Sequence, residues 1–506
     1  SKCSDTTHLY HWASKICSAE ANKITTAHTA ASPISIRVLI TFTHYAHRSL
    51  RNSVPAPPLM AQRTQRLLAT ARRSVPEGTY AVGAGLLVAG LTAYGFQIIS
   101  FRALSKPDYA ALNALWVFVF VLAPGFFLPL EQEVGRAVSH RQAQDIGGGP
   151  VVKRAALAGV ALSCGLALIT ILAALGTPLV ETLFEGDAGL AACLIIALFT
   201  YCFEHIARGT LSGNHRFGPY GLIIGAEGAV RIVGCIALAL AGVSNPVYYG
   251  LCLAIPPAIA TGIALWGQSG LVKPGPVAPW SEISTNIGYL LMGSLLAQVL
   301  SYSPFIGAQL LAGPNDRGKV ADLIVGLFLA RIPILLFQAV QASLLPRLAA
   351  LASEGNSADF RDGLKKLIVV VVGIAVIGVI AAATLGAAVG QILFGDKFVL
   401  GSRDLALLAA GCGLFIIALT LAQALIALMG HAQAVIAWAA GIVMVIIVTA
   451  LTGPDLYLRV ELGFIAGAAT STALMGLFLG LRLRRELPAG SLASLVEQIE
   501  HEPLEI

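Results

Sequence analysis

The sequence has little charge: only 12% of its 506 residues are Asp, Glu, Lys or Arg. A water-soluble chain of this length carries roughly 25% charged residues, so the composition argues against a soluble enzyme. Apolar residues make up 56% of the chain. They gather in runs of about 20, long enough to cross the hydrocarbon core of a bilayer as helices. The alternating pattern of a membrane barrel strand is missing, so these runs are predicted to be helical.

Groups that catalyse reactions or hold cofactors are also scarce. None of the eight cysteines forms a C-x-x-C pair, and we find no metal-ligand cluster, nucleophile elbow or carboxylate dyad. Residues 313–319 approach a nucleotide-binding loop but lack the Ser or Thr that would bind magnesium. The loops are too short for an aqueous catalytic domain. We therefore predict a protein that is not an enzyme, with no cofactor and no nucleic-acid partner.

The apolar runs predict an all-α polytopic membrane protein with about 12 transmembrane helices. The expected spans are 79–101, 109–130, 155–176, 189–208, 219–242, 246–268, 284–311, 321–345, 364–387, 404–428, 432–452 and 462–482.

The segments outside the spans differ in character. Residues 1–59 show no sustained periodicity and precede Met60, which opens a basic stretch. We interpret them as a disordered or non-native extension. Residues 269–283 are predicted to form a linker on the cytoplasmic side, and residues 486–506 a cytoplasmic tail.

The positive charges predict the orientation in the membrane. From Met60 onward, Lys and Arg outside the spans or at their ends number 18 on the side of the N-terminus and seven on the other side. Cytoplasmic loops carry the excess of Lys and Arg, so both termini are expected in the cytoplasm. An even number of spans agrees with this orientation.

Short loop motifs recur in the same order about 210 residues apart. Leu183-Phe-Glu-Gly-Asp187 precedes the fourth span, and Leu393-Phe-Gly-Asp396 precedes the tenth. Ser212-Gly-Asn-His215 follows the fourth span, and Met429-Gly-His431 follows the tenth. The loops after spans 1 and 7 and the ends of spans 2 and 8 also correspond.

Six spans separate each motif from its counterpart, so both halves enter the membrane from the same side. The sequence therefore predicts two parallel six-helix halves, residues 60–268 and 284–485, around a central cavity. Parallel repeats of this kind are related by an axis along the membrane normal and are typical of alternating-access transporters. Chance similarity among Gly-, Ala- and Leu-rich helices is the alternative explanation.

These motifs resemble a known family. Arg102-Ala-Leu-Ser-Lys-Pro-Asp-Tyr109 after the first span resembles the R-x-L-G-x-x-x-Y-G turn of polysaccharide-export flippases, although Ala110 stands where that family usually has glycine. Gly213-Asn-His215 resembles the turn between their fourth and fifth helices. With the Leu-Phe-Gly-Asp turns, the chain from Met60 to about Arg485 resembles the multidrug/oligosaccharidyl-lipid/polysaccharide exporter superfamily, and within it the polysaccharide-biosynthesis (Wzx-type) branch.

The resemblance implies a transporter in a bacterial cytoplasmic (inner) membrane. Its expected substrate is a polyprenyl-diphosphate-linked glycan, which alternating access would move across the lipid bilayer. Cell-envelope biosynthesis proteins are possible partners.

Ionisable groups inside the spans are candidates for substrate binding, because they are costly in lipid. Glu227 and Arg231 lie in span 5 at i and i+4, and Arg331 lies in span 8 just before Pro333. Their arginines could grip a diphosphate bidentately, and Glu227 could neutralise Arg231 in an empty cavity or titrate. Gln338 and Gln341 are expected on the same face of span 8. The structural alternative is a closed Glu227–Arg231 pair and an Arg331 that caps carbonyls freed by the proline.

Charged residues also mark the cytoplasmic ends of spans 2 and 4. Glu133 and Arg136 lie at the first, and Glu204 and Arg208 at the second. They could form a gate whose ion pairs break as the halves rock. The alternative is an interfacial belt of charge.

Other functions stay open. An ion-coupled multidrug antiporter of the same superfamily generally has an acidic residue in span 1, which is missing here. A major-facilitator porter should show a charged turn after span 2, and residues 133–136 resemble that turn only weakly. A membrane glycosyltransferase would need a longer outer loop. A non-transporting membrane scaffold with the same fold is a further alternative.

Overall fold

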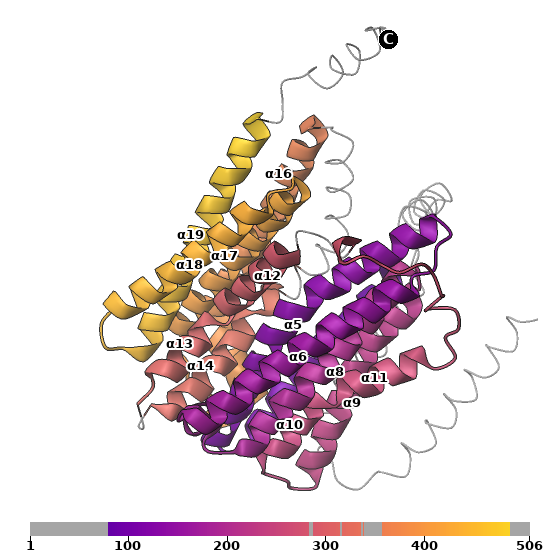
Figure 1. Ribbon diagram of the computed structural model, residues 1–506. Coiled ribbons are helices and arrows are strands. Elements are labelled where there is room, and N and C mark those ends of the chain that lie inside the picture. The colour runs from indigo at the N-terminus through magenta and orange to yellow at the C-terminus, as the bar shows by residue number, and fades with distance from the viewer. Residues whose placement is uncertain (1–78, 283–286, 314–315, 335–336, 338–356, 486–506) are drawn as a thin grey trace, which may run out of the picture. The chain divides into compact units, whose positions relative to one another are not determined.

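The computed structural model describes residues 79–282, 287–313, 316–334, 337 and 357–485. In these ranges the long regular elements are helices, as Figure 1 shows. In the N-terminal half they are α4 (Thr79–Ala103), α5 (Lys106–Ala143), α6 (Gly149–Gly176), α7 (Leu179–Phe184), α8 (Ala188–Gly213), α9 (Phe217–Leu240), α10 (Pro246–Ala254) and α11 (Pro256–Leu265). In the C-terminal half they are α12 (Ile287–Ser301), α13 (Ser303–Leu311), α14 (Arg317–Ala330), α16 (Ser357–Phe394), α17 (Ser402–Ala427), α18 (His431–Leu451) and α19 (Leu456–Arg485). Two 3-10 turns, η1 (Trp280–Glu282) and η2 (Gly395–Lys397), complete the elements.

Each predicted span coincides, over the residues that the structure describes, with a helix or a pair of helices. Ten are long and apolar enough to cross a membrane, or eleven if the bent pair α12 and α13 is one span. The remaining span begins with α14, and most of the rest of it lies outside the described residues. The chain is thus a multi-pass membrane protein, and the predicted all-α polytopic fold is confirmed. Residues 1–59 and 486–506 also lie outside the described residues.

Prolines divide two of the predicted spans. Span 6 is divided at Ile255 into α10 and α11, where Pro256 and Pro257 follow in the first turn of α11. In span 7, α12 and α13 meet at 63°, and Pro304 lies in the first turn of α13. Proline has no N–H to continue the helical ladder, so a helix breaks before it.

The recurring turns share a backbone conformation. His215 follows α8 with a φ of 57°, and Met429 follows α17 with a φ of 59°. The two Leu-Phe turns also contain left-handed residues, Glu185 with a φ of 51° and Gly395 with a φ of 77°. A non-glycine residue at positive φ is uncommon. Its recurrence at corresponding turns supports the predicted repeat.

The helix pairings of the two halves also correspond. In the N-terminal half α4 packs on α9, α5 on α8, α6 on α8, and α9 on α10 and α11. In the C-terminal half, in the same order, α12 packs on α18, α14 on α17, α16 on α17, and α18 on α19. Between the halves, α5 packs on both α12 and α14. These shared pairings are what two copies of one six-helix unit would give, while the contact of α13 with α19 has no counterpart of similar extent in the N-terminal half.

Central and lipid-facing helices differ in burial. In α5, α8 and α17, 67% of the most apolar window is buried, compared with 22% in α6 and α18 and 17% in α16. The exposed side chains of α6 and α16 include Leu168, Ile169, Ile377 and Ile380. Such apolar surfaces face hydrocarbon in a bilayer, which replaces a second protein layer. The buried helices therefore position any polar site.

Candidate functional site

Arg231 lies on α9 with its guanidinium enclosed by protein. Its Nη2 pairs with the carboxylate of Glu227, one turn earlier on the same helix. Tyr201 of α8 donates a hydrogen bond of 2.7 Å to Oε1 of that carboxylate. The Arg231 guanidinium carbon lies 5.4 Å from the centre of the Trp116 ring. Arg231 is thus a neutralised cation inside the N-terminal half.

Arg331, directly after α14, has different surroundings. Its Nη2 donates a hydrogen bond of 2.8 Å to Oγ of Ser301, and its guanidinium carbon lies 3.9 Å from the centre of the Tyr302 ring. Its Nη1 is buried and has no hydrogen-bond partner among the described residues. Within the same residues we find no carboxylate paired with this guanidinium. Arg331 therefore keeps a donor that an anion could use.

An aromatic cluster lies where the two halves meet, and we define it as Tyr94, Trp116, Phe120 and Phe328. The Trp116 and Phe328 rings are 5.6 Å apart, edge to face, and Tyr94 donates a hydrogen bond of 3.1 Å to the Phe328 carbonyl. Arg231 covers Trp116 from the N-terminal half, and Arg331, which caps the end of α14, lies three positions after Phe328. The cluster connects the surroundings of the two arginines.

Two predicted site residues cannot be placed beside them. Gln338 and Gln341 lie outside the described residues, so their position on the substrate face stays a prediction.

A buried charge network surrounds two of the predicted gate residues. Arg208 lies 3.2 Å from Glu204 and 3.3 Å from Glu131, measured between side-chain N and O atoms. His205 Nδ1 lies 2.7 Å from the second oxygen of Glu131. Tyr220 donates a hydrogen bond of 2.7 Å to the first. These side chains belong to α5, α8 and α9, so the network lies inside the N-terminal half.

The other two predicted gate residues, Glu133 and Arg136, pair with each other on α5 at 2.9 Å. Arg136 Nη2 also donates a hydrogen bond of 2.7 Å to the backbone carbonyl of Glu282, in the linker between the halves. Of the two predicted gate pairs, this one thus has a described contact outside its own half.

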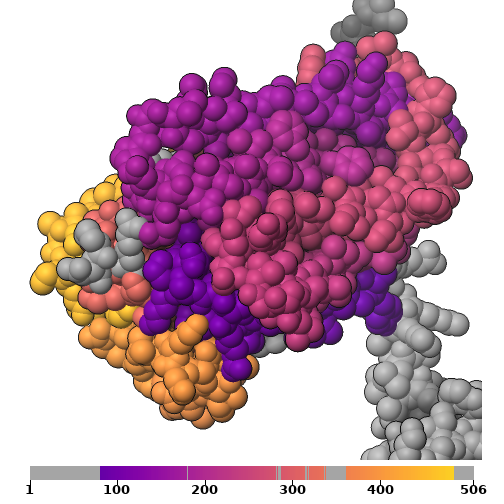
Figure 2. All heavy atoms as spheres, turned by 90° about the horizontal axis from the view of Figure 1, so that it is seen from below, coloured from indigo at the N-terminus to yellow at the C-terminus, as the bar shows by residue number. Residues whose placement is uncertain are grey.

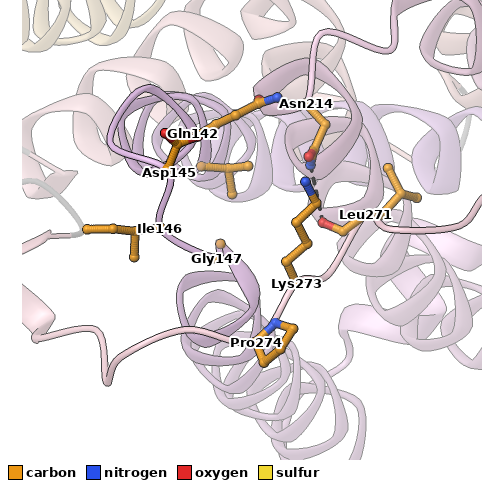
Figure 3. A pocket seen from close by; sticks show the side chains of 10 residues that line it. Gln142, Asp145, Ile146, Gly147, Asn214, Leu271, Lys273 and Pro274 are labelled. Atoms are coloured by element: carbon orange, nitrogen blue, oxygen red, sulfur yellow. Dashed lines mark hydrogen bonds between the residues drawn. The ribbon is translucent and has the colours of Figure 1, made fainter.

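The linker is bound to the N-terminal half by Arg141. This arginine donates hydrogen bonds of 2.5 and 2.8 Å to the two carboxylate oxygens of Glu282, and it reaches the carbonyls of Gly147 and Pro276. The Arg141 hydrogen bond holds the pKa of Glu282 below its usual range. Beside this contact lies a pocket of about 320 Å³, whose lining includes Asn214 and Lys273 (Figure 3).

A set of contacts joins the halves at the opposite end of the helices, which the charge bias assigns to the outside and which we call the outer end. Lys106 Nζ lies 2.8 Å from a carboxylate oxygen of Asp322. Arg102 donates hydrogen bonds of 3.0 Å to the carbonyls of Ile392 and Leu393. We call these contacts the outer clasp. Figure 2, which looks onto the outer ends, shows the indigo surface that includes α4 beside the orange surface that includes α16.

Sequence reasoning did not single out the clasp or the linker contact. Arg141 counted only as a positive charge outside the spans, and Lys106 also belonged to the motif after span 1, without a partner being predicted for it. Asp322 lies just inside predicted span 8, so the rule for intramembrane charges could have found it. Glu282 is the one acidic residue of the sequence between 268 and 284. The partners of these residues are distant in sequence and needed the fold to be identified.

Comparisons with known proteins place this geometry among transporter folds. No family model matches the sequence, and no curated protein matches it. Among solved structures, the chain is similar to an inward-facing multidrug resistance MATE family transporter of the MOP superfamily, with a TM-score of 0.62 and 15% identity over 80% of this chain and 98% of the other. For an outward-facing structure of such a transporter the TM-score is 0.59, with 15% identity over 81% and 96%. The chain therefore has the MATE transporter fold.

Proposed function

We propose that this protein is an alternating-access transporter that moves a lipid-linked oligosaccharide or polysaccharide precursor across a bacterial cytoplasmic membrane. Two observations support transport: the MATE fold, which is known in inward- and outward-facing conformations, and the corresponding helix pairings of the two halves. The outer clasp joins the halves at the end that the charge bias predicts to lie outside, so we expect the substrate head to enter from the cytoplasmic side while its lipid tail stays in the bilayer.

The observation on which the substrate rests is the Arg331 guanidinium, which is half-buried and whose Nη1 is enclosed. It has a hydrogen-bond donor without a partner and no carboxylate neighbour among the described residues. A half-buried cation without a counterion is disfavoured relative to a paired one, and a diphosphate would supply both charge and hydrogen-bond acceptors. Arginine matches the geometry of phosphate oxygens bidentately. Arg331 is thus suited to hold the diphosphate of a polyprenyl-linked glycan.

Arg231 would become a second contact for the diphosphate when the substrate displaces Glu227. In the empty state Glu227 neutralises Arg231. An incoming diphosphate near Trp116 could compete for the guanidinium, after which Tyr201 would remain hydrogen bonded to Glu227. Gln338 and Gln341 are proposed to contact the sugars from the following turns of span 8.

The gate is proposed to rest on the Glu133–Arg136 pair, because Arg136 contacts the linker between the halves. Glu204 and Arg208 would support it from within the N-terminal half, since their described partners all belong to α5, α8 and α9.

A second candidate function is export of organic cations, as in the multidrug transporters that share the fold. The aromatic cluster favours it, because the faces of Trp, Tyr and Phe bind cations. Arg231 already occupies two of these rings, Trp116 at 5.4 Å and Phe120 at 5.9 Å. The cluster is therefore engaged by the protein's own cation, which weakens this alternative.

The test is depletion of the protein in its host, followed by lipid extraction and a probe of the membrane face on which carrier-linked glycans lie. The flippase proposal expects glycans to accumulate on the cytoplasmic face. Wild-type protein should restore export, and Arg331→Ala should not. Normal carrier lipids in cells that have become sensitive to amphiphilic cations would contradict the proposal and favour the multidrug alternative.

A further inference from the structure

One buried carboxyl group in the C-terminal half has no role in the proposed substrate site. Glu461 lies in the second turn of α19, at the outer end, and its exposed fraction is 0%. Neither of its carboxyl oxygens has a hydrogen-bond partner among the described residues. A carboxylate buried in this way is strongly disfavoured unless it binds a cation or a proton.

The charged groups around Glu461 are already engaged. Arg459, two positions earlier on α19, donates a hydrogen bond of 3.0 Å to the Thr449 carbonyl, and the others interact with Glu461 electrostatically. From α17 these are Arg403 and Asp404, and from the loop before α19 the residue is Asp455. Arg403 already pairs with Asp404 at 2.7 Å and lies 3.8 Å from Asp455. An ionised Glu461 would add a third carboxylate around this single guanidinium.

The other helices packed on α19 offer no counterion. The sequences of α12 and α13 contain no acidic or basic residue, and the one ionisable residue of α18, His431, lies at its opposite end. The α14 residue in this region is Asp322, which, like Asp404, Asp455 and Glu461, interacts electrostatically with Tyr457 of α19. Asp322 itself is bound by Lys106 in the outer clasp.

A proton fits this site better than a metal ion. Hard metal cations need several oxygen ligands that converge on one point. In the part of the chain that the structure describes, no group of three or more His, Cys, Asp or Glu side chains is arranged to hold a metal. A proton needs only one oxygen, and it removes the uncompensated charge.

We propose that Glu461 is a proton-binding site, loaded from the outer face, whose occupancy favours the closed outer clasp. The bound proton leaves Asp404 and Asp455 with Arg403, and Asp322 with Lys106. Release of the proton to water at the outer end leaves a carboxylate that must be hydrated. Water reaches it most easily if α19 loosens from α17, beside the Lys106–Asp322 pair. The response of the clasp to outer pH does not depend on the proposed substrate. Only its physiological role rests on the proposed transport function.

The first test is infrared spectroscopy of the purified full-length protein in neutral buffer. We expect the C=O stretching band of a protonated carboxyl in wild type, and the loss of this component in Glu461→Gln. Asp455→Asn, which alters an exposed carboxylate of the same region, is the matched control and should keep the band. Absence of a protonated carboxyl band in wild type, or full retention of the band in Glu461→Gln, would overturn the proposal.

The second test reads the clasp without measuring transport. Glu181→Cys and Val399→Cys, in a background without the native cysteines, place spin labels at exposed outer positions of the two halves. We expect their separation to increase when the pH is raised from mildly acidic to alkaline, and to stay short at both values in Glu461→Gln. An identical pH response in both proteins would refute the coupling. Neither readout needs a glycan substrate, so failure of the flippase proposal would leave these results interpretable.

Discussion

The two intramembrane arginines are the same residue type in opposite electrostatic states. Arg231 in the N-terminal half has a carboxylate partner and lies between α9 and aromatic rings of α5. Arg331 in the C-terminal half has a serine hydroxyl and the Tyr302 ring as neighbours and no carboxylate partner among the described residues. Each guanidinium has one buried nitrogen without a hydrogen-bond partner there, Nε of Arg231 and Nη1 of Arg331. The comparison shows why intramembrane charge alone does not define a binding site. The groups already bound to the charge decide whether it can bind something else.

The largest expected effect is on the stability of the paired arginine. Arg231→Met leaves Glu227 buried without its cation, so we expect a loss of about 3–5 kcal/mol in the free energy of unfolding. The double variant Arg231→Met with Glu227→Gln should recover most of this loss, because no buried charge remains. Thermal unfolding in detergent measures both. Equal losses in the single and double variants would show that the pair does not act as a closed unit.

Arg331 should show the reverse behaviour, with a small effect on stability and a large effect on substrate. Its charge-assisted hydrogen bonds to a diphosphate are worth about 1.5–3 kcal/mol, so Arg331→Ala should weaken binding roughly 10- to 100-fold. Arg331→Lys keeps the charge without the bidentate geometry and should lie between. A loss of stability as large as that of Arg231→Met would remove the distinction between the two arginines.

The outer clasp should respond more weakly. Lys106 is partly exposed, and a pair of this kind contributes about 0.2–1 kcal/mol. We expect Lys106→Asp to increase the labelling of cysteines at the outer end, and the charge-swapped double variant Lys106→Asp with Asp322→Lys to reduce it again. Unchanged labelling in the single variant would indicate that the backbone contacts of Arg102 hold the halves together without this ion pair.

The smallest effect concerns the linker at low pH. Because Arg141 lowers the pKa of Glu282, their contact stabilises the folded linker fully above the unfolded pKa of about 4.3. This stabilisation is lost as the pH falls through the lower, folded pKa. Limited proteolysis between residues 268 and 282 should therefore increase only under acidic conditions in wild type. In Arg141→Met it should already be high at neutral pH. A wild type that is cleaved equally at both pH values would contradict the role of this contact.

The sequence predicted the spans well because lipid imposes a simple rule. A helix must be about 20 apolar residues long to cross the hydrocarbon core, and the observed helices coincide with the predicted runs. The breaks at Ile255 and Tyr302 were not predicted, although Pro256 and Pro304 signal them. Proline is tolerated inside α5, at Pro124 and Pro129, so its presence alone does not fix a break.

The site was predictable in part. The i, i+4 spacing of Glu227 and Arg231 indicated their pairing, because partners on one helix need no tertiary information. The spacing could not show that Trp116 covers Arg231, or that Lys106 meets Asp322 from a position 216 residues away. The isolation of Glu461 was also hidden, since it depends on Arg403 being occupied by other carboxylates. Contacts between elements require the packed structure.

The most direct test of the central claim is the binding of polyprenyl diphosphate to the purified full-length protein, measured by titration calorimetry in detergent. The proposal predicts that wild type binds the lipid, that Arg331→Ala binds it at least roughly tenfold more weakly, and that Arg102→Ala, a clasp variant of the same charge change, binds it like wild type. Equal affinity in wild type and Arg331→Ala would contradict the claim that the unpaired arginine between the halves holds the diphosphate.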